Sequence, residues 1–219
     1  PTAQIICDLQ YSDSSPSEIA PRQVLKKIIK LLEKEEMEAV VAPELEFYLC
    51  EQNLDPDLPL KTPIGKSGRR ETGSRVFGID AVNEFDTLTD DIYDYCEILK
   101  IGVDTLIHES GPSQIEINLN HGDPLALADQ AFMFKRAVRQ VALKHGIHAT
   151  FMAKPYQGHP GSSMHIHHNL ISSKTKKNLF CDEDGNNSKT FFNFIGGLQT
   201  YLPDAMLFFA PYVNSYRRF

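Results

Sequence analysis

Two glutamates that are two residues apart, Glu44 and Glu46, could bind a metal ion. They lie in the segment 39–50, whose β-branched and aromatic residues predict a strand. Because side chains alternate along a strand, both carboxylates lie on one face while Leu45 and Phe47 point into the core. Two like charges held side by side repel unless a cation lies between them, and a divalent metal ion is the commonest such cation. Two solvent-exposed glutamates on an edge strand are the alternative.

A second pair of carboxylates, Glu109 and Glu116, flanks the turn between two predicted strands, 103–108 and 114–119. The isoleucines on either side of Glu116 face the core, which places Glu116 on the opposite face of its strand. Glycine and proline in the turn would let the chain fold Glu109 back toward Glu116. Four glutamates on matching sheet faces favour a metal site more strongly than one pair does.

Two histidines, His165 and His167, also occupy alternate positions of a predicted strand, 163–171. Imidazole nitrogens bind transition metals and can donate hydrogen bonds to phosphate oxygens. A lone histidine on a strand is more often structural. Here the pair follows a glycine-serine turn that begins at Gly161, and the glycine backbone could approach a ligand closely. The arrangement therefore favours a functional role.

The elements that must position these residues predict an α+β fold. The short, turn-rich connection at 109–113 makes the strands on either side of it antiparallel neighbours. We expect an antiparallel sheet with helices packed on one face, incomplete in this chain. Helical spacing of apolar residues covers 21–37, 86–100, 124–143 and 189–201, and strand patterns cover 39–50, 103–108, 114–119, 148–153 and 163–171.

Prolines, glycines and one aspartate indicate where these elements begin and end. Asp123 and Pro124 are the predicted cap and first residue of the third helix, and Gly146 is expected to close it. Pro43 is expected to interrupt the first strand, and Pro203 to break the last helix. The segment 51–75 carries three prolines and three glycines and is expected to be a long, mobile loop.

Composition limits the class of protein. The chain has 219 residues, of which 42% are hydrophobic and 23% charged, as in an ordinary globular protein of one large domain or two small ones. Its net charge of −7 makes a nucleic acid or an anionic lipid an unfavourable partner. The apolar runs are too short to span a membrane and no signal peptide opens the sequence, so we expect a cytoplasmic protein.

The four cysteines form no metal-binding or redox pattern. Cys7, Cys50, Cys96 and Cys181 lie far apart, without a C-x-x-C pair and without zinc-site spacing. We expect them to be free thiols, mostly buried or half-buried.

Four blocks of sequence carry a resemblance to a known family. They are 43–47 (PELEF), 109–116 (ESGPSQIE), 161–167 (GSSMHIH) and 214–219 (NSYRRF). In this order they resemble the glutamine synthetase superfamily, and they span nearly the whole chain. The resemblance is closest to the γ-glutamylputrescine, or γ-glutamylpolyamine, synthetase branch. Pro160 stands where relatives that use ammonia usually carry an asparagine, and Asn169 replaces a common serine.

The resemblance implies two metal sites. Glu46, Glu109 and Glu116 would bind the ion that positions glutamate. Glu44 and His165 would bind a second ion that serves the phosphates of ATP. Hard carboxylate ligands favour Mg²⁺ or Mn²⁺ at both sites.

It also implies substrate contacts. His167 would contact a nucleotide phosphate, and Asp104 and Asn169 would also contribute to ATP binding. Gly161 would contact the amino group of glutamate through its backbone, and Arg218 would bind the glutamate carboxylate.

The activity implied by the resemblance is that of an ATP-dependent ligase. It would form a γ-glutamyl amide from glutamate and an amine, putrescine or another polyamine, through γ-glutamyl phosphate. Two alternatives stay open: glutamine synthesis from ammonia, and a non-catalytic structural member of the superfamily. In the family the general base comes from a neighbouring subunit's N-terminal domain, so no catalytic residue is assigned in this sequence.

Members of the family are longer than this chain. The resemblance therefore implies that residues 1–219 are a partial catalytic domain, without the N-terminal β-grasp domain and without the C-terminal part that carries further arginines and a last glutamate ligand. We expect this chain alone to be inactive. Because family members assemble as stacked rings, the complete protein is expected to be a large homo-oligomer.

Overall fold

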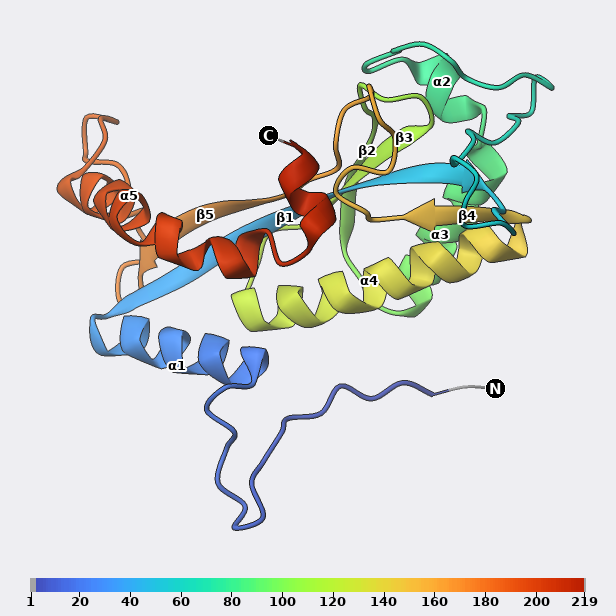
Figure 1. Ribbon diagram of the computed structural model, residues 1–219. Helices are drawn as coiled ribbons and strands as arrows, with labels where there is room; N and C mark the ends of the chain where they lie inside the picture. The colour runs from blue at the N-terminus through green and yellow to red at the C-terminus, as the bar shows by residue number, and fades with distance from the viewer. Residues whose placement is uncertain (1–2, 219) are drawn as a thin grey trace. The chain divides into compact units, whose positions relative to one another are not determined.

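The computed structural model describes residues 3–218, which divide into two compact units. Unit 1 comprises the described residues up to 41 with 121–129 and 167–203, and unit 2 comprises 42–120, 130–166 and the described residues from 204 on. Phe219, the last residue of the fourth sequence block, lies outside the described part. Figure 1 shows the course of the chain.

The helices are α1 (Pro21–Lys34), α2 (Ile79–Asn83), α3 (Asp86–Ile98), α4 (Pro124–Lys144), α5 (Lys189–Phe209) and the 3₁₀ helix η1 (Val213–Arg218). The strands are β1 (Met37–Glu51), β2 (Val103–His108), β3 (Gln114–Leu119), β4 (Ile147–Thr150) and β5 (Met164–Ser172). Within the described residues they form one sheet in the order β2-β3-β1-β4, and β5 also pairs with β1. β1 is antiparallel to β3 and β4, and β2 is antiparallel to β3. The predicted α+β class is confirmed.

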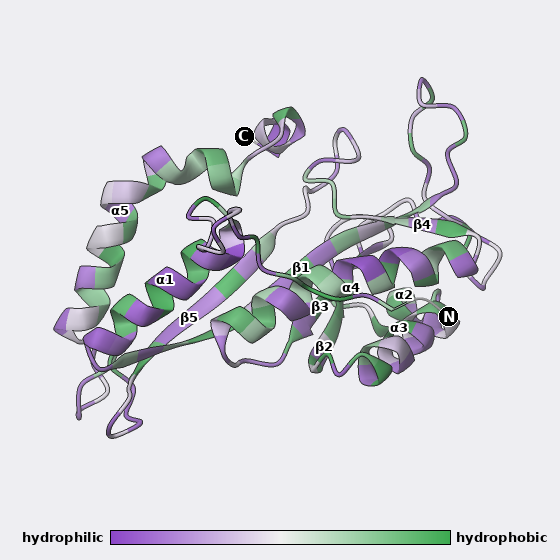
Figure 2. Ribbon diagram, turned by 90° about the horizontal axis from the view of Figure 1, so that it is seen from below, coloured by the Kyte–Doolittle hydropathy of each residue, from purple (hydrophilic) through white to green (hydrophobic). Residues whose placement is uncertain are grey.

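The core of unit 2 lies on one face of the sheet. Leu45 and Phe47 of β1 lie opposite Ile117 and Ile115 of β3, and all four side chains are fully buried. The ring of Phe151 packs against Phe47 with centroids 5.2 Å apart. Figures 1 and 2 show α3 and α4 on the same side of the sheet. The opposite face of β1 and β3 is thereby left to polar side chains, as the alternation of residues predicts.

The ends of α4 agree with the prediction. The Asp123 side chain accepts a hydrogen bond from the backbone N–H of Ala126 at 2.8 Å, so it caps the first turn. Beyond the last turn, Gly146 has a φ of +74°, a left-handed conformation that glycine adopts without strain.

Two predictions about prolines were wrong. Pro43 does not interrupt β1, because the ladder with β3 begins one residue later, at the pair of Glu44 and Asn118. The backbone N–H that proline lacks is therefore not needed for any hydrogen bond between β1 and β3. Pro203 does not end the last helix, since α5 continues to Phe209. A proline removes a single hydrogen bond of the helix, and the flanking turns are retained here.

Several short elements differ from the prediction. The expected strand 148–153 ends at Thr150, because the Thr150 hydroxyl accepts a hydrogen bond from the N–H of Met152 at 3.2 Å and turns the chain. α2 and η1 were not predicted. Each is about one or two turns long, too short for apolar periodicity to be detected.

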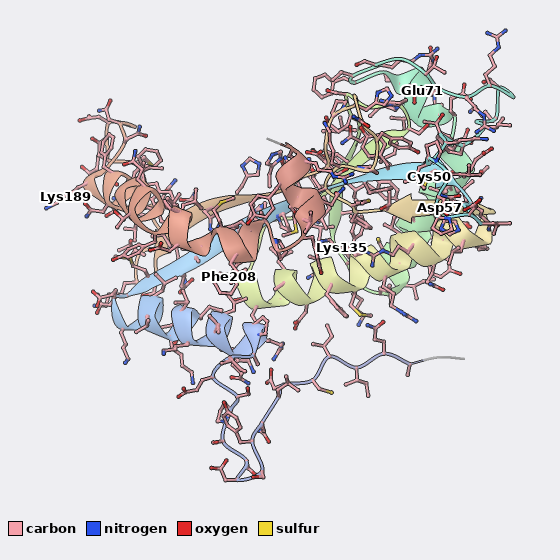
Figure 3. The ribbon with its side chains drawn as sticks, in the orientation of Figure 1. Cys50, Asp57, Glu71, Lys135, Lys189 and Phe208 are labelled. Carbon is pink, nitrogen blue, oxygen red and sulfur yellow. The ribbon has the colours of Figure 1, made fainter. Side chains whose placement is uncertain are left out.

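The cysteines are free thiols, as predicted, but only two are buried. Cys50, near the end of β1 (Figure 3), and Cys96 of α3 are buried, and burial raises the pKa of each thiol to about 11. Cys7 and Cys181 are exposed, which corrects the expectation for these two. Neither lies in a helix or strand, where alternation or helical spacing would have indicated its burial.

Unit 1 is held together by ion pairs and by aromatic packing. The guanidinium of Arg22, at the start of α1, donates to both carboxylate oxygens of Asp129 at 3.0 Å. Phe180 packs against Phe191 and Phe194 of α5, with ring centroids 5.7 and 5.2 Å away. Nowhere in residues 3–218 is a helix both long and apolar enough to cross a bilayer.

Candidate metal and substrate site

The pairing of β1 with β3 brings the predicted carboxylates together. Glu46 lies directly opposite Glu116, and Glu44 is two residues away on the same face, opposite Asn118. Glu46 and Glu116 are only 7% and 6% exposed. Ionised carboxylates are almost never buried to this extent unless they are paired or bind a metal. The predicted common face of these glutamates is confirmed.

β5 adds an imidazole to the same group. The Nδ1 atom of His165 lies 3.3 Å from Oε2 of Glu44 and 3.8 Å from Oε1 of Glu46. One ligand atom from each of Glu44, Glu116 and His165 lies within 4.8 Å of the other two. These residues therefore converge closely enough to bind one divalent ion, and their oxygen and nitrogen donors suit Mg²⁺ or Mn²⁺.

The electrostatics of Glu116 also favour a cation at this place. Burial, followed by the charges of Glu44, Glu109 and Glu46, raises the pKa of Glu116 to about 7. Glu109 is thus close enough for its charge to act on Glu116. A divalent cation would offset both the burial and the repulsion. The residues present fit the implied metal.

Glu46 is held by groups that sequence reasoning missed. The Gln114 amide donates to Oε2 of Glu46 and to the backbone carbonyl of Gly161, both at 3.1 Å. The backbone N–H of Ser163 donates to the same oxygen at 3.1 Å, and the Ser163 hydroxyl donates to Oε1. Gln114 is fully buried. The signal was available, since Gln114 is two residues before Glu116 and shares its face.

Gly161 and Arg218 lie side by side in unit 2. A Cβ atom built on Gly161 would be 2.6 Å from the carbonyl oxygen of Ala153 and 3.1 Å from Cγ and Nε of Arg218. Only glycine fits this position without displacing its neighbours. Nearby, the Asn214 side chain accepts from the N–H of Lys154 at 2.7 Å and donates to its carbonyl at 3.0 Å, which ties η1 to this loop.

The turn between β2 and β3 is closed against Tyr48. The Tyr48 hydroxyl donates to the carbonyl of Pro160 at 2.7 Å. A Cβ atom on Gly111 would lie 1.8 Å from that hydroxyl oxygen. The absence of a side chain at Gly111 therefore lets the turn that carries Glu109 pack onto a buried tyrosine of β1.

Replacing Gly111 with alanine is expected to lower the free energy of unfolding by about 1–3 kcal/mol, the usual cost of overpacking a buried position. The added methyl group would push the Tyr48 ring aside and break its bond to Pro160. Thermal or urea unfolding measures the effect. Gly73→Ala is the matched control, because a Cβ atom there meets nothing within 4 Å. Equal stability of the two variants would contradict the packing described.

Three further residues, Asp104, His167 and Asn169, were predicted to contribute to ATP binding. Asp104 is exposed on β2, at a point where a register shift between Val103 and Leu106 interrupts the regular pairing with β3. The charge of Asp104 contributes to a raised pKa of Tyr93 on α3, after the larger effects of burial and Cys96. His167 and Asn169 follow His165 on β5 and belong to unit 1.

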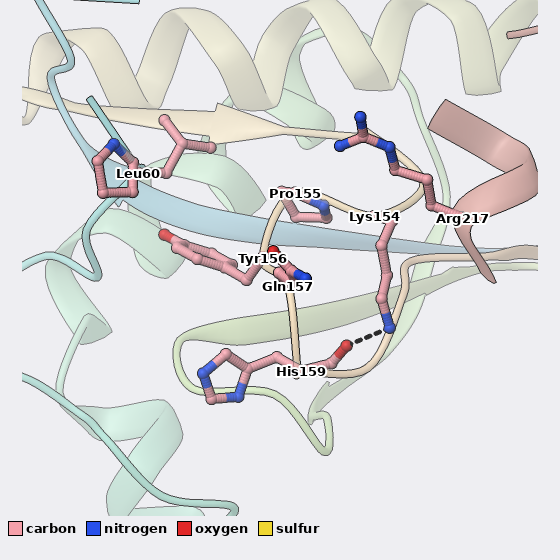
Figure 4. A pocket seen from close by; sticks show the side chains of 8 residues that line it. Leu60, Lys154, Pro155, Tyr156, Gln157, His159 and Arg217 are labelled. Carbon is pink, nitrogen blue, oxygen red and sulfur yellow. Dashed lines mark hydrogen bonds between the residues drawn. The ribbon is translucent and has the colours of Figure 1, made fainter. Parts of the chain in front are cut away.

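A pocket of about 730 Å³ in unit 2 is lined by residues of the long loop, of the loop after β4 and of η1 (Figure 4). Lys154, His159 and Arg217 contribute to its lining, and none of the lining residues is acidic. The Lys154 ammonium points to the backbone oxygen of His159, to which it donates a hydrogen bond. Sequence reasoning did not predict this pocket.

The chain is similar to proteins of known class. The model of the glutamine synthetase catalytic domain matches residues 18–219. The chain is 38% identical to the gamma-glutamylputrescine synthetase PuuA of Escherichia coli K12, over 99% of the chain and 46% of that protein. It is 35% identical to a glutamine synthetase of Thermus thermophilus, over 99% of the chain and 47% of that protein. The chain therefore spans about half the length of the curated relatives it matches.

Solved structures share the fold. The chain superposes on a structure described as "Apo GmaS without ligand" with a TM-score of 0.81 and 28% identity, over 96% of this chain and 48% of that one. A Plasmodium falciparum glutamine synthetase gives a TM-score of 0.80 at 24% identity, over 97% of this chain and 46% of that one.

Proposed function

The chain belongs to the glutamine synthetase catalytic-domain family, and from this membership we propose that it forms the metal- and glutamate-binding part of an ATP-dependent ligase that joins glutamate to an amine. The observation that carries the proposal is the convergence of Glu46, opposite Glu116, with Glu44 and His165 on one face of the sheet. Residues 18–219 then correspond to part of the catalytic domain of a longer, ring-forming homo-oligomer.

The chemistry needs this concentration of ligands. A carboxylate is a poor electrophile, so the γ-carboxylate of glutamate first attacks the γ-phosphorus of ATP and ADP leaves. The amine then attacks the acyl carbon of γ-glutamyl phosphate, phosphate leaves, and the amine loses a proton. Two bound Mg²⁺ or Mn²⁺ ions would neutralise the charge on the transferring phosphoryl group.

The residues of this chain divide between the two ions. In our proposal Glu46, Glu109 and Glu116 hold the ion beside glutamate, and Glu44 and His165 hold the ion beside the ATP phosphates. The position of Glu116 opposite Glu46 supports its place in the first set. Its reach to Glu44 and His165 means that the two sets of ligands adjoin each other. Gln114 and Ser163 keep the Glu46 carboxylate oriented.

Further residues are assigned to substrate binding. Arg218 binds the glutamate carboxylate, and the backbone of Gly161 binds its amino group. The closeness of these two residues supports the pairing of roles. His167, Asn169 and Asp104 contribute to ATP binding, and these three roles rest on the family resemblance.

A polyamine such as putrescine is the proposed amine. Pro160 stands where ammonia-using relatives usually have asparagine, and identity to a gamma-glutamylputrescine synthetase is 38% against 35% for glutamine synthetases. Ammonia is the second candidate, because both kinds of enzyme are among the relatives.

An amine panel tests the proposal. The protein that carries this chain, together with the parts its relatives have, is incubated with ATP, Mg²⁺, glutamate and either putrescine, spermidine or ammonium. Mass spectrometry of the γ-glutamyl products is expected to show the polyamine adducts in excess. Glutamine as the main product would replace the polyamine assignment with ammonia. No γ-glutamyl product with any amine would contradict the ligase itself.

A further inference from the structure

A buried carboxylate from the long loop, Glu71, contacts the turn that carries Glu109. Its Oε2 atom lies 2.9 Å from Nε2 of His108 and accepts a hydrogen bond from the backbone N–H of Ser113 at 2.6 Å. The side chains of Glu71 and His108 are 8% and 0% exposed. Figure 3 labels Glu71 on this loop. One carboxylate oxygen therefore touches both ends of the connection between β2 and β3.

The hydrogen-bond partners of His108 show which of its ring nitrogens carries a proton. Nδ1 of His108 lies 2.8 Å from the backbone oxygen of Glu109, and a carbonyl oxygen can only accept, so Nδ1 carries a proton. A second proton is shared between Nε2 and the Glu71 carboxylate. The imidazole ring is thus fixed at both nitrogens. Through it, Glu71 holds the carbonyl of Glu109 as well as the N–H of Ser113.

Stability alone does not account for this arrangement. Removing an imidazole and a carboxylate from water costs about as much free energy as their interaction returns. The other Glu71 oxygen, Oε1, is buried and has no hydrogen-bond partner among the described residues. Ser113 has a φ of +58°, a left-handed conformation that non-glycine residues rarely adopt. The contacts of Glu71 stabilise an unfavourable turn, which points to a requirement for its shape.

We propose that Glu71 is a positioning residue of the metal centre. Acting through His108 and Ser113, it fixes the turn so that the Glu109 carboxylate reaches the ion shared with Glu116. The inference deepens the proposed function and rests on it, since it requires a metal at the carboxylate cluster. Residues that do not touch the metal but orient its ligands typically contribute about 10–100-fold to metal affinity, and this affinity is lost when they are removed.

Mn²⁺ binding measures this effect without any catalysis. Free Mn²⁺ is followed by electron paramagnetic resonance during titration of the wild-type protein and of three variants. Glu71→Ala is expected to weaken the tighter-bound ion about 10–100-fold. Glu71→Gln is expected to retain more of the affinity than Glu71→Ala, because an amide oxygen in the place of Oε2 can still accept the hydrogen bond from the backbone N–H of Ser113.

The third variant, Arg70→Ala, is the matched control. The Arg70 guanidinium anchors the same loop to Glu51, next to Glu71 but at the surface. It is expected to leave Mn²⁺ affinity unchanged. If Arg70→Ala weakens Mn²⁺ binding as much as Glu71→Ala does, any contact that attaches this loop to the sheet has the same effect. Glu71 then has no specific positioning role, and the proposal is wrong. Equal losses in Glu71→Gln and Glu71→Ala would also contradict it.

Failure of the inference can be told from failure of the proposed function. A wild-type protein that binds no Mn²⁺ contradicts the metal centre itself. Wild-type binding with an unchanged affinity in Glu71→Ala overturns only the role of Glu71. If circular dichroism shows that Glu71→Ala is unfolded, Glu71→Asp replaces it, since aspartate keeps the charge but withdraws the carboxylate by one methylene group. Weaker Mn²⁺ binding is again expected, and unchanged binding overturns the inference.

Discussion

Replacing Glu116 with glutamine is expected to abolish the Mn²⁺-dependent rise in the unfolding temperature while making the metal-free protein more stable at pH 8. Glu116 lies opposite Glu46 and within ligand distance of Glu44 and His165, so its loss removes the carboxylate common to the cluster. Without metal, the same change removes a buried negative charge from a site that already holds several. A thermal shift series with and without Mn²⁺ measures both effects.

The pH dependence of the metal-free protein follows from the pKa of Glu116. Burial and neighbouring carboxylates raise this pKa from 4.5 to about 7 in the folded state. Between these values the folded state binds more protons than the unfolded state, so stability falls as pH rises from about 5 to about 7. The loss is nearly complete by about pH 8 and amounts to at most about 3 kcal/mol. In Glu116→Gln this part of the pH dependence is expected to vanish.

The control for this experiment is Glu33→Gln, which removes an exposed carboxylate of α1. It is expected to keep both the Mn²⁺ effect and the pH dependence. Full retention of the Mn²⁺ effect in Glu116→Gln would contradict the metal centre. A wild-type protein with no Mn²⁺ effect at all would favour the non-catalytic member of the superfamily instead.

Replacing His165 with alanine is expected to reduce the number of bound Mn²⁺ ions from two to one. His165 and Glu44 are assigned to the ion that serves the ATP phosphates, and the Nδ1 atom of His165 lies 3.3 Å from the Glu44 carboxylate. The glutamate-side ion keeps Glu46, Glu109 and Glu116 and is expected to remain. Isothermal titration calorimetry with Mn²⁺ gives the stoichiometry directly.

His121→Ala, which removes an exposed histidine of unit 1, is the control and is expected to keep two ions. Two ions in His165→Ala would show that this histidine is not a ligand. Loss of both ions would show that the ligands are not divided between two independent sites, which would contradict the proposed partition.

The site-bearing strands could be predicted because their patterns are local. The bounds predicted for 103–108 and 114–119 agree with β2 and β3, and the period of two placed Glu44, Glu46 and Glu116 on one face. The alternation of side chains between the two faces of a strand can be read from neighbouring residues alone. The turn of glycine and proline between the strands then fixed their antiparallel pairing.

The contact of Glu71 could not be predicted because its partner is distant in sequence: Glu71 contacts His108 across 37 residues. Gln114 contacts Glu46 across 68 residues, but alternation along the strand already indicated that it shares the face of Glu116. Nothing in the local pattern of the segment 51–75 distinguishes Glu71 from the other charged residues of a polar loop. Pro43 and Pro203 show the converse limit, since a local rule predicted that each would break its element, yet β1 continues through Pro43 and α5 continues through Pro203.

The central claim, that the protein activates glutamate as an acyl phosphate, is tested most directly by trapping with hydroxylamine. Hydroxylamine attacks an acyl phosphate whichever amine the enzyme prefers. The protein carrying this chain, with the remaining parts that its relatives have, is incubated with ATP, glutamate, Mg²⁺ and hydroxylamine. We predict γ-glutamyl hydroxamate in amounts equal to the ADP released, and none when ATP, glutamate or Mg²⁺ is omitted. ADP release without hydroxamate, or no reaction in a protein that binds Mn²⁺, would contradict the account.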